Sequence, residues 1–382
     1  ANDSSVSSIT VTNDTTAPTV SSVSSNTADG TYNIGDVIEI AVALSEVVTV
    51  TGTPQLTLET GATDRTADYA SGSGTNTLVF SYTVQSGDTT SDLAYTGASS
   101  LALNGGTILD NANNSAILTL PTVGGTGSLS DSSAVVVDGV RPAFTAGATT
   151  GGTKSLVLSL GEAVSGAPEV GDFAVTVNSV ANTVTAVSAA SDSTSITLTL
   201  TDIVANSSTV AVAYTANSET AKQLSDASGN TVANDSSVSS ITVTNDTTAP
   251  NQPVNPMSIA AATDGINADE QSEGISVLLD LTDTSAAVGD TAEIFLNGSS
   301  FVQAVSYVLQ EADISNENAI INIDSNAGWG SDGPQTLSAR IVDVVGNIGA
   351  FGGATTVTLD TTAPTIDAVS ADWGSVLNST ED

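Results

Sequence analysis

The sequence predicts an all-β protein built from several β-sandwiches in tandem, and three observations support this prediction. Val, Thr, Ser, Ala and Leu alternate with a period of two, while helical periodicity is nearly absent. Glycine clusters such as Gly105-Gly106 and Gly124-Gly125 mark turns between the alternating runs. A short tag, Asp-Thr-Thr-Ala-Pro, recurs at intervals that suit one sandwich of about 100 residues each.

The tag stands at Asp14–Pro18, Asp246–Pro250 and Asp360–Pro364, with a variant, Asp-Gly-Val-Arg-Pro, at Asp138–Pro142. Proline fixes its own φ and pushes its predecessor toward extended conformations, so each tag predicts a short, stiff joint. The four prolines are 124, 108 and 114 residues apart. We therefore expect the last strand of a preceding domain (1–14), three complete domains (15–139, 140–247 and 248–361) and the start of a fourth (362–382).

Residues 1–18 recur letter for letter at 233–250. Eighteen identical positions do not arise by chance, so the upstream domain is expected to end as the second domain does. The chain is therefore expected to be a piece of a longer array in which some domain types are reused.

Each domain is expected to contain about seven strands with turns every 8–12 residues, which is typical of a sandwich. In the first domain we expect strands at 19–24, 37–44, 54–59, 78–84, 93–95, 117–120 and 134–137. In the second we expect them at 155–160, 173–177, 196–200, 210–214 and 241–244, and in the third at 275–281, 292–296, 319–323, 336–344 and 355–359.

The composition excludes several classes of function. With 42 acidic and five basic residues the net charge is −37, which repels nucleic acid and anionic membranes. No run of 18 apolar residues is present, so we expect no membrane insertion. The absence of Cys and His excludes disulfides, zinc sites built on these ligands and Ser-His or Cys-His nucleophiles. Only a glycosidase-like carboxylate pair remains for catalysis, and nothing predicts its cleft, so we expect no enzyme.

A second motif, Asp-x-x-Gly-Asn, precedes the last strand of each domain. It stands at Asp226–Asn230 and Asp343–Asn347, with a degraded copy at Asp110–Asn114 in which Asn113 replaces Gly. Together with the tag, this motif resembles the bacterial immunoglobulin-like repeats of giant cell-surface adhesins. The second domain is similar to repeats of a cyanobacterial cell-surface protein needed for swimming. The third, with Asp264–Glu270 after its first strand, resembles repeats of biofilm-associated adhesins.

Acidic residues are expected to gather at the joints, because loops from alternating strands share a pole of a sandwich with a tag. We expect Glu46 and Asp110 around Asp14; Asp36, Asp88, Asp92, Glu162 and Asp226 around Asp138; Asp202, Asp280, Asp283 and Asp343 around Asp246; and Asp264, Asn267, Asp269, Glu270 and a further candidate, Asp332, around Asp360.

Carboxylates that converge repel one another unless a cation lies between them. Hard oxygen ligands favour Ca²⁺ or Mg²⁺, and Ca²⁺ tolerates irregular geometry better, so we expect Ca²⁺. The resemblance also implies repeats stiffened by calcium. Two simpler interpretations stay open: an Asp before a turn often caps that turn, and Asp-x-x-Gly-Asn can be a hairpin loop whose Gly and Asn supply positive φ.

These features predict a structural extender in a very large bacterial surface or secreted adhesin. Tandem sandwiches would contact their neighbours in the chain and form a calcium-stiffened rod that projects a binding module from the cell. The alternative is a subunit that self-associates laterally into an extracellular filament, sheath or surface layer. Carbohydrate binding by one domain is a third alternative, for which aromatic platforms are scarce at 4% aromatic residues.

Overall fold

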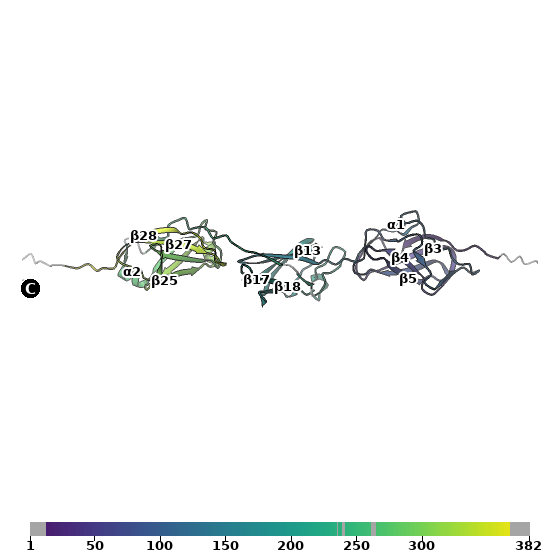
Figure 1. The fold of residues 1–382 in the computed structure, drawn as a ribbon, viewed down its shortest axis with the longest axis horizontal. Coiled ribbons are helices and arrows are strands. Elements are labelled where there is room, and N and C mark those ends of the chain that lie inside the picture. Colours follow the sequence, from purple (N-terminus) through teal and green to yellow (C-terminus); the bar gives the residue numbers. More distant parts are fainter. Residues whose placement is uncertain (1–12, 235, 239–240, 261–264, 367–382) are drawn as a thin grey trace, which may run out of the picture. The chain divides into compact units, whose positions relative to one another are not determined.

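The computed structural model describes residues 13–234, 236–238, 241–260 and 265–366. Its strands form three successive pairs of sheets, with three short helices, which confirms the all-β prediction (Figure 1). We call these pairs the first, second and third sandwiches; they span residues 20–138, 144–244 and 258–360. The predicted strand of a preceding domain, most of the predicted fourth domain and Asp264 lie outside the described residues.

The chain divides into two compact units. The first contains residues 1–149, 154–203 and 208–243, and the second contains residues 150–153, 204–207 and 244–382. The first sandwich and most of the second therefore share a unit, and the third belongs to the other. The domain boundaries proposed at the tags stay predictions.

The first sandwich has a large sheet in the order β1-β3-β6-β5-β4-β8, with β10 paired to β3 and β9 to β4, and a small sheet in the order β2-β11-β7. Its elements are β1 (Val20–Ser25), β2 (Gly30–Tyr32), β3 (Val37–Thr51), β4 (Gln55–Glu59), β5 (Arg65–Ser71), β6 (Thr75–Thr83), β7 (Thr89–Thr90), β8 (Ala94–Tyr95), β9 (Leu101–Ala102), β10 (Thr107–Leu109), α1 (Leu129–Ser132) and β11 (Val135–Asp138).

Alternation along these strands buries one face, as at Ile38, Ile40 and Val42 of β3. Two predictions for this sandwich were wrong. The strand that begins at Val37 does not end at Leu44 but continues to Thr51 through an irregularity between Ala43 and Val48. The run 117–120 forms no strand, only a parallel bridge between Ile117 and Thr19.

The second sandwich has one sheet in the order β16-β17-β13-β12-β20 and another in the order β15-β14-β18-β19. Its strands are β12 (Phe144–Thr150), β13 (Thr153–Val164), β14 (Phe173–Val177), β15 (Val180–Ala181), β16 (Val184–Ala189), β17 (Ser193–Val204), β18 (Val210–Tyr214), β19 (Ser236–Ser237) and β20 (Ile241–Thr244). Buried Leu156, Leu158 and Tyr214 contribute to its interior.

The third sandwich has sheets in the orders β21-β23-β26 and β22-β28-β27-β24-β25. Its elements are β21 (Ser258–Ile259), β22 (Ile266–Asn267), α2 (Ala268–Glu273), β23 (Ile275–Asp280), β24 (Thr291–Leu296), β25 (Ser299–Val308), α3 (Glu311–Ser315), β26 (Asn318–Ile323), β27 (Gly333–Val342) and β28 (Gly352–Asp360). Its core includes Trp329, which is 1% exposed and packs edge-on against Phe301.

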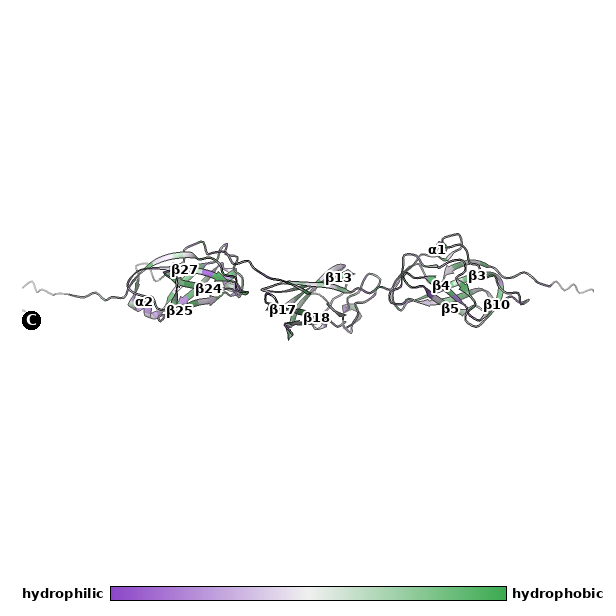
Figure 2. Ribbon diagram, in the orientation of Figure 1, coloured by the Kyte–Doolittle hydropathy of each residue, from purple (hydrophilic) through white to green (hydrophobic). Residues whose placement is uncertain are grey.

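Hydrophobic residues recur along the strands of every sandwich (Figure 2). The strand alternation, not any continuous apolar segment, therefore supplies the cores. Across the described residues, every helix is too short to cross a lipid bilayer.

In each sandwich an early strand lies beside the final strand. In the first, β2 pairs in parallel with β11, and Gly30 stands opposite Val135. In the third, β22 pairs in parallel with β28. In the second, β12 and β20 are neighbours in one sheet. In the first and third sandwiches the chain therefore enters at one pole and leaves at the opposite pole.

We predict that Phe301→Ala destabilises the third sandwich by about 3–5 kcal/mol, because a buried ring is lost and a cavity opens beside Trp329. Urea unfolding followed by tryptophan fluorescence measures the change. The control Ile320→Ala removes a side chain that is 64% exposed and should shift the free energy of unfolding by less than about 0.5 kcal/mol. Equal effects of the two substitutions would contradict the assigned core.

Candidate metal centres at the tags

Three carboxylates meet at the start of the first sandwich. Within the described ranges, Asp14, Glu46 and Asp110 each place one oxygen within 4.8 Å of the other two. The sequence predicts this grouping. Glu46, however, does not lie in a loop, because it belongs to β3 at the point where the register with β6 shifts. A bulge of this kind re-aims a side chain, and here it directs Glu46 toward the tag.

The charges of this group act on one another. Partial burial, and then the charges of Asp14 and Asp110, raise the pKa of Glu46 above its ordinary value. Burial acts to raise the pKa of Asp110 as well, but hydrogen bonds from Asn114 and from the backbone of Ala112 and Asn113 outweigh it and lower that pKa. Asp110 is thus held ionised beside a Glu46 that resists ionisation.

The Asp of every tag has the same local geometry. Its Oδ1 accepts the backbone N–H two residues later, at 2.9 Å in Asp14, 2.9 Å in Asp246, 3.1 Å in Asp138 and 3.2 Å in Asp360. This is an Asx-turn, so the simpler interpretation of these residues is correct for one oxygen. In an Asx-turn the other carboxylate oxygen points away from the turn and can serve a second partner.

The Asp-x-x-Gly-Asn motif ties the tag to its sandwich. In the first sandwich the Asn114 side-chain amide donates to Asp110 Oδ2 at 2.7 Å and to the carbonyl of Asp14 at 3.1 Å. The backbone N–H of Asn114 donates to Asp110 Oδ1 at 2.7 Å. We call this arrangement the asparagine latch, because one amide holds both the motif's carboxylate and the tag's backbone.

The latch is present in all three sandwiches. Asn230 donates to Asp226 Oδ2 at 3.0 Å and to the Asp138 carbonyl at 2.8 Å. Asn347 donates to Asp343 Oδ2 at 2.7 Å and to the Asp246 carbonyl at 3.1 Å. In each case the tag is fastened to the sandwich that follows it.

The residue before each latch asparagine has a positive φ: 70° at Asn113, 96° at Gly229 and 95° at Gly346. The hairpin-loop interpretation is therefore right about glycine and wrong about the final Asn, whose side chain is used for the latch. Asn113 replaces Gly in the degraded copy because Asn tolerates the left-handed conformation better than most residues.

Three further carboxylates interact through their charges at Asp138, although among the described residues only those at Asp14 bring their oxygens within 4.8 Å of one another. Partial burial, and then the charges of Asp226 and Asp138, raise the pKa of Glu162. Glu162 lies near the end of β13 in the sequence Leu-Gly-Glu-Ala-Val, which resembles Leu-Ser-Glu-Val-Val around Glu46. The Asp138 carboxylate also accepts the Ser228 hydroxyl at 2.7 Å.

A third group lies at Asp246 within the second unit, and it contains a residue that the sequence prediction missed. Burial, together with the charges of Asp343 and Asp246, raises the pKa of Asp290, although backbone hydrogen bonds from Ala287 and Val344 oppose this. Asp290 is 2% exposed, and all three carboxylates line one cavity of about 310 Å³.

A sequence signal for Asp290 exists. Gly-Asp stands before a strand at Asp36, Asp88, Asp172 and Asp290, and each carboxylate accepts the backbone N–H three residues earlier, at 2.8–2.9 Å. The pattern predicts a capped turn, but only the fold shows which of these turns lies at a tag.

Of the acids expected at Asp138 from the far pole of the first sandwich, Asp88 is engaged inside that sandwich, and the membership of Asp36 and Asp92 stays a prediction. Asp36 caps its turn. Asp88 is 1% exposed and accepts bonds from Arg65 Nε at 2.8 Å and the Tyr82 hydroxyl at 2.6 Å. Asp92 is exposed, and slight desolvation and the charge of Asp29 raise its pKa. At this tag the first sandwich contributes an amide: Asn33 Nδ2 donates to the Ser228 carbonyl of the second sandwich at 2.7 Å.

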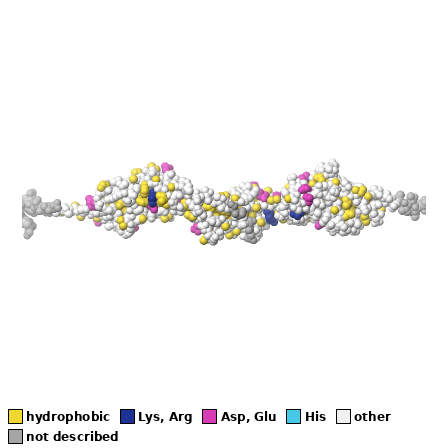
Figure 3. Space-filling view, in the orientation of Figure 1, with side chains coloured by type: hydrophobic (Ala, Val, Ile, Leu, Met, Phe, Trp, Pro, Cys, Tyr) yellow, Lys and Arg dark blue, Asp and Glu magenta, His cyan; other side chains and the backbone are white. Residues whose placement is uncertain are grey.

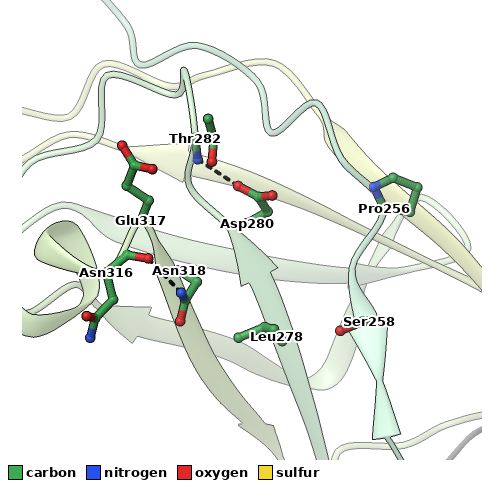
Figure 4. Close-up of a pocket in the computed structure, with 8 residues that line it drawn as sticks. All are labelled: Pro256, Ser258, Leu278, Asp280, Thr282, Asn316, Glu317 and Asn318. Atoms are coloured by element: carbon green, nitrogen blue, oxygen red, sulfur yellow. Dashed lines mark hydrogen bonds between the residues drawn. The ribbon is translucent and has the colours of Figure 1, made fainter.

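The membership of Asp202, Asp280 and Asp283 in the group at Asp246 stays a prediction. Asp202 and Asp283 are exposed, and the carbonyl of Asp283 accepts the side-chain amide of Asn251, next to the tag, at 3.0 Å. Asp280 lines a groove on the outer side of the small sheet of the third sandwich, beside Leu278 and Asn318 (Figure 4). Hydrogen bonds from Thr282 and then Asn255 lower the pKa of Asp280.

At the last tag, Asp360, Asn267 and Asp269 line one cavity. Asn267 and Glu270 cap α2 reciprocally: Asn267 Oδ1 accepts the backbone N–H of Asp269 and Glu270, and Glu270 accepts that of Asn267. Asp332 accepts hydrogen bonds from Thr362 and Thr361, which lower its pKa to about 2.

The donor sets at the first three tags consist of carboxylates and backbone carbonyls. These are hard oxygen ligands, which fit Ca²⁺ and do not suit soft transition metals. Basic side chains are sparse on the visible surface, where scattered acidic side chains stand among uncharged ones (Figure 3). Asp14, Glu46 and Asp110 would hold an ion at the first tag, Asp138, Glu162 and Asp226 at the second, and Asp246, Asp290 and Asp343 at the third.

Comparison with protein families gives one match, which begins at the last strand of the first sandwich and continues into the second. Residues 134–219 match the repeat described as "Putative flagellar system-associated repeat". This segment covers one tag and most of the strands that follow it. No curated protein matches the chain.

Solved structures of low similarity are also found. The N-terminal part of the bacterial S-layer protein SbsC is 12% identical, with a TM-score of 0.25, over 57% of this chain and 44% of that one. This chain therefore spans less than half of that structure. The titin fragment I67–I69 is 11% identical, with a TM-score of 0.27, over 91% and 99% of the two chains. Fibronectin(III)-like modules of Clostridium thermocellum CbhA are 8% identical, with a TM-score of 0.19, over 58% and 93%.

We predict that Asn347→Ala loosens the third tag, because the Asp246 carbonyl and the Asp343 carboxylate each lose a donor. The free energy of unfolding should fall by about 1–3 kcal/mol. Hydrogen exchange of the amides around residues 246–250 should accelerate in the variant. Asn316→Ala, an exposed asparagine of the same sandwich, is the control and should leave exchange at the tag unchanged.

We predict a pH-dependent difference between the wild type and Glu46→Gln in calcium-free buffer. The raised pKa of Glu46 means that its contribution to stability is fully present below the ordinary Glu pKa of about 4.3 and is lost as the pH rises through the folded-state value. At pH 7 the Gln variant should therefore melt at a higher temperature than the wild type.

The control for this experiment is Glu39→Gln, an exposed residue on the same strand. Melting curves of the three proteins from pH 4 to pH 8 in chelator measure the difference. A gap between the wild type and Glu46→Gln that does not change with pH would contradict the electrostatic coupling.

Proposed function

We propose that this chain is a structural extender segment of a giant repetitive bacterial adhesin, on the cell surface or secreted. In this proposal the tandem sandwiches form a spacer that projects a binding module, and Ca²⁺ at the tags stiffens it. The observation that carries the proposal is the arrangement repeated at the first three tags: an Asx-turn, an asparagine latch and carboxylates whose charges interact, which at the first tag lie within 4.8 Å of one another.

The latch supports a joint whose orientation is set by the following sandwich. The tag's backbone is fastened by Asn114, Asn230 or Asn347, and proline restricts the residues beside it. The carboxylates remain mutually repulsive, as the raised pKa of Glu46 indicates. A divalent cation would remove this repulsion and pull the tag toward the sandwich, so the joint would become stiffer.

The motif match to a repeat described as flagellar system-associated supports a place outside the cell. The negative charge of the chain is compatible with this location and opposes contact with nucleic acid. The chain contains no Cys and no His, so it cannot form a Ser-His or Cys-His nucleophile, which is compatible with the proposed structural role.

Self-assembly into a filament, sheath or surface layer is the second candidate, and one observation favours it. Leu278 and Ile320 stand opposite each other on the outer face of the small sheet of the third sandwich, and they are 39% and 64% exposed. Sedimentation of the chain in calcium distinguishes the candidates, because a spacer stays monomeric and an assembly subunit grows with concentration.

We predict that calcium lengthens and narrows the particle seen by small-angle X-ray scattering, relative to the same protein in chelator. Each occupied site should also stabilise its sandwich by about 2.7 kcal/mol when free calcium is 100 times the dissociation constant. Identical scattering profiles with and without calcium would remove stiffening by calcium from the proposal.

The variant Asp138→Ala tests one joint. It removes a carboxylate from the second group and the acceptor of the Ser228 hydroxyl, but leaves the Asp138 carbonyl for the latch. We expect calcium to lose its effect at this tag while both neighbouring sandwiches stay folded. Unfolding of a whole sandwich would show that Asp138 serves the fold of that sandwich instead of the joint.

A further inference from the structure

The pairing of early and final strands gives each sandwich a specific mechanical geometry. In the first sandwich, Gly30, Thr31 and Tyr32 of β2 stand opposite Val135, Val136 and Val137 of β11, and the strands run in parallel. In the third, Ile266 and Asn267 stand opposite Leu359 and Asp360, also in parallel.

The second sandwich has the same arrangement in β12 and β20. A Cβ at Gly147 would meet Ile241, and the N–H of Gly151 donates to the carbonyl of Thr244 at 2.8 Å. The earlier glycine lies beside the earlier residue of β20, and the later glycine beside the later one, so the two segments run in parallel. The pattern is therefore independent of the different sheet orders of the three sandwiches.

Tension along the chain pulls the early and the final strand of a sandwich in opposite directions. It pulls the early segment toward the N-terminal tag and the final strand toward the C-terminal tag. Parallel neighbours pulled in opposite directions must slide along each other, so all of their hydrogen bonds are loaded together. An antiparallel hairpin pulled apart at its open end instead loses its bonds one after another.

The tag is fastened before tension reaches the strands. In the first sandwich the Asn114 amide holds the Asp14 carbonyl at 3.1 Å, and the Ile117 N–H holds the Pro18 carbonyl at 2.8 Å. Beyond them β1 is paired with β3 along its length, from Val20 opposite Leu44 to Ser25 opposite Ile40. Force applied on the N-terminal side is therefore borne first by the hydrogen bonds of the tag and of β1, and only then by β2.

We infer that the chain is built to bear tension, with each sandwich resisting extension through its parallel early and final strands. This function goes beyond the proposed spacer, because it concerns force along the chain and requires no calcium. It also ranks the sandwiches: the first has three paired residues in this contact and the third has two, so the first resists the larger force.

The experiment pulls the whole 382-residue chain in an optical trap along two axes through the first sandwich. The chain contains no cysteine, so introduced cysteines define the attachment points. Thr15→Cys with Val140→Cys applies force along the chain. Asp64→Cys with Ser86→Cys, both exposed, pulls apart the open end of the hairpin β5–β6. All measurements are made in chelator, so that failure of the calcium proposal leaves this one testable.

We expect the rupture force along the chain to be severalfold higher than that across the hairpin at the same loading rate. Forced unfolding depends on the barrier along the pulled direction, so equal equilibrium stability of the two variants, checked in urea, does not predict equal forces. Equal or reversed rupture forces would overturn the inference.

A second pair of attachment points tests the ranking. Thr247→Cys with Ala363→Cys pulls the third sandwich along the chain, and both positions are exposed. We expect it to rupture at a lower force than the first sandwich. A third sandwich that withstands the higher force would show that the parallel pairs do not set the resistance.

Discussion

The structure depends on one side-chain amide in each sandwich. The latch asparagine satisfies a carboxylate four residues earlier and at the same time fixes the backbone of the tag. Without it, the Asp of the motif, which is buried in the first two sandwiches, would have one donor fewer, and the tag would keep only backbone contacts such as that of Ile117 N–H with the Pro18 carbonyl in the first sandwich. The position of the remaining carboxylates follows from this contact, since the tag brings its own acid to the motif's acid.

Much of this could be predicted from the sequence because it depends on local pattern. Alternation located β14, β18 and β20 at their observed bounds, since strands buried on one face have a period of two. The grouping of Asp14, Glu46 and Asp110 followed from strand direction alone. β25 was missed because its polar residues interrupt the alternation, and its place depends on pairing with β24.

The rest required tertiary information. Nothing in the sequence around Asp88 indicates that Arg65 and Tyr82 would occupy its carboxylate, because those contacts join residues brought together by the sheet. Asp290 and Asp36 have the same local turn, but the turn of Asp290 brings its carboxylate to the acids of the tag, whereas the turn of Asp36 meets the next tag through Asn33 and Ile34. The short motif thus identifies a capped turn, while the fold decides whether it acquires a second role.

Each latch and each carboxylate group is assembled from a tag and the sandwich downstream of it. A gene segment that begins just before a tag and ends just before the next one therefore encodes every side chain of its own latch. Such segments can be duplicated, lost or exchanged by recombination without leaving an incomplete group behind. The array can change length over evolutionary time while each tag keeps its own latch, and only the contacts from the sandwich upstream, such as that of Asn33 with Ser228, depend on the neighbour.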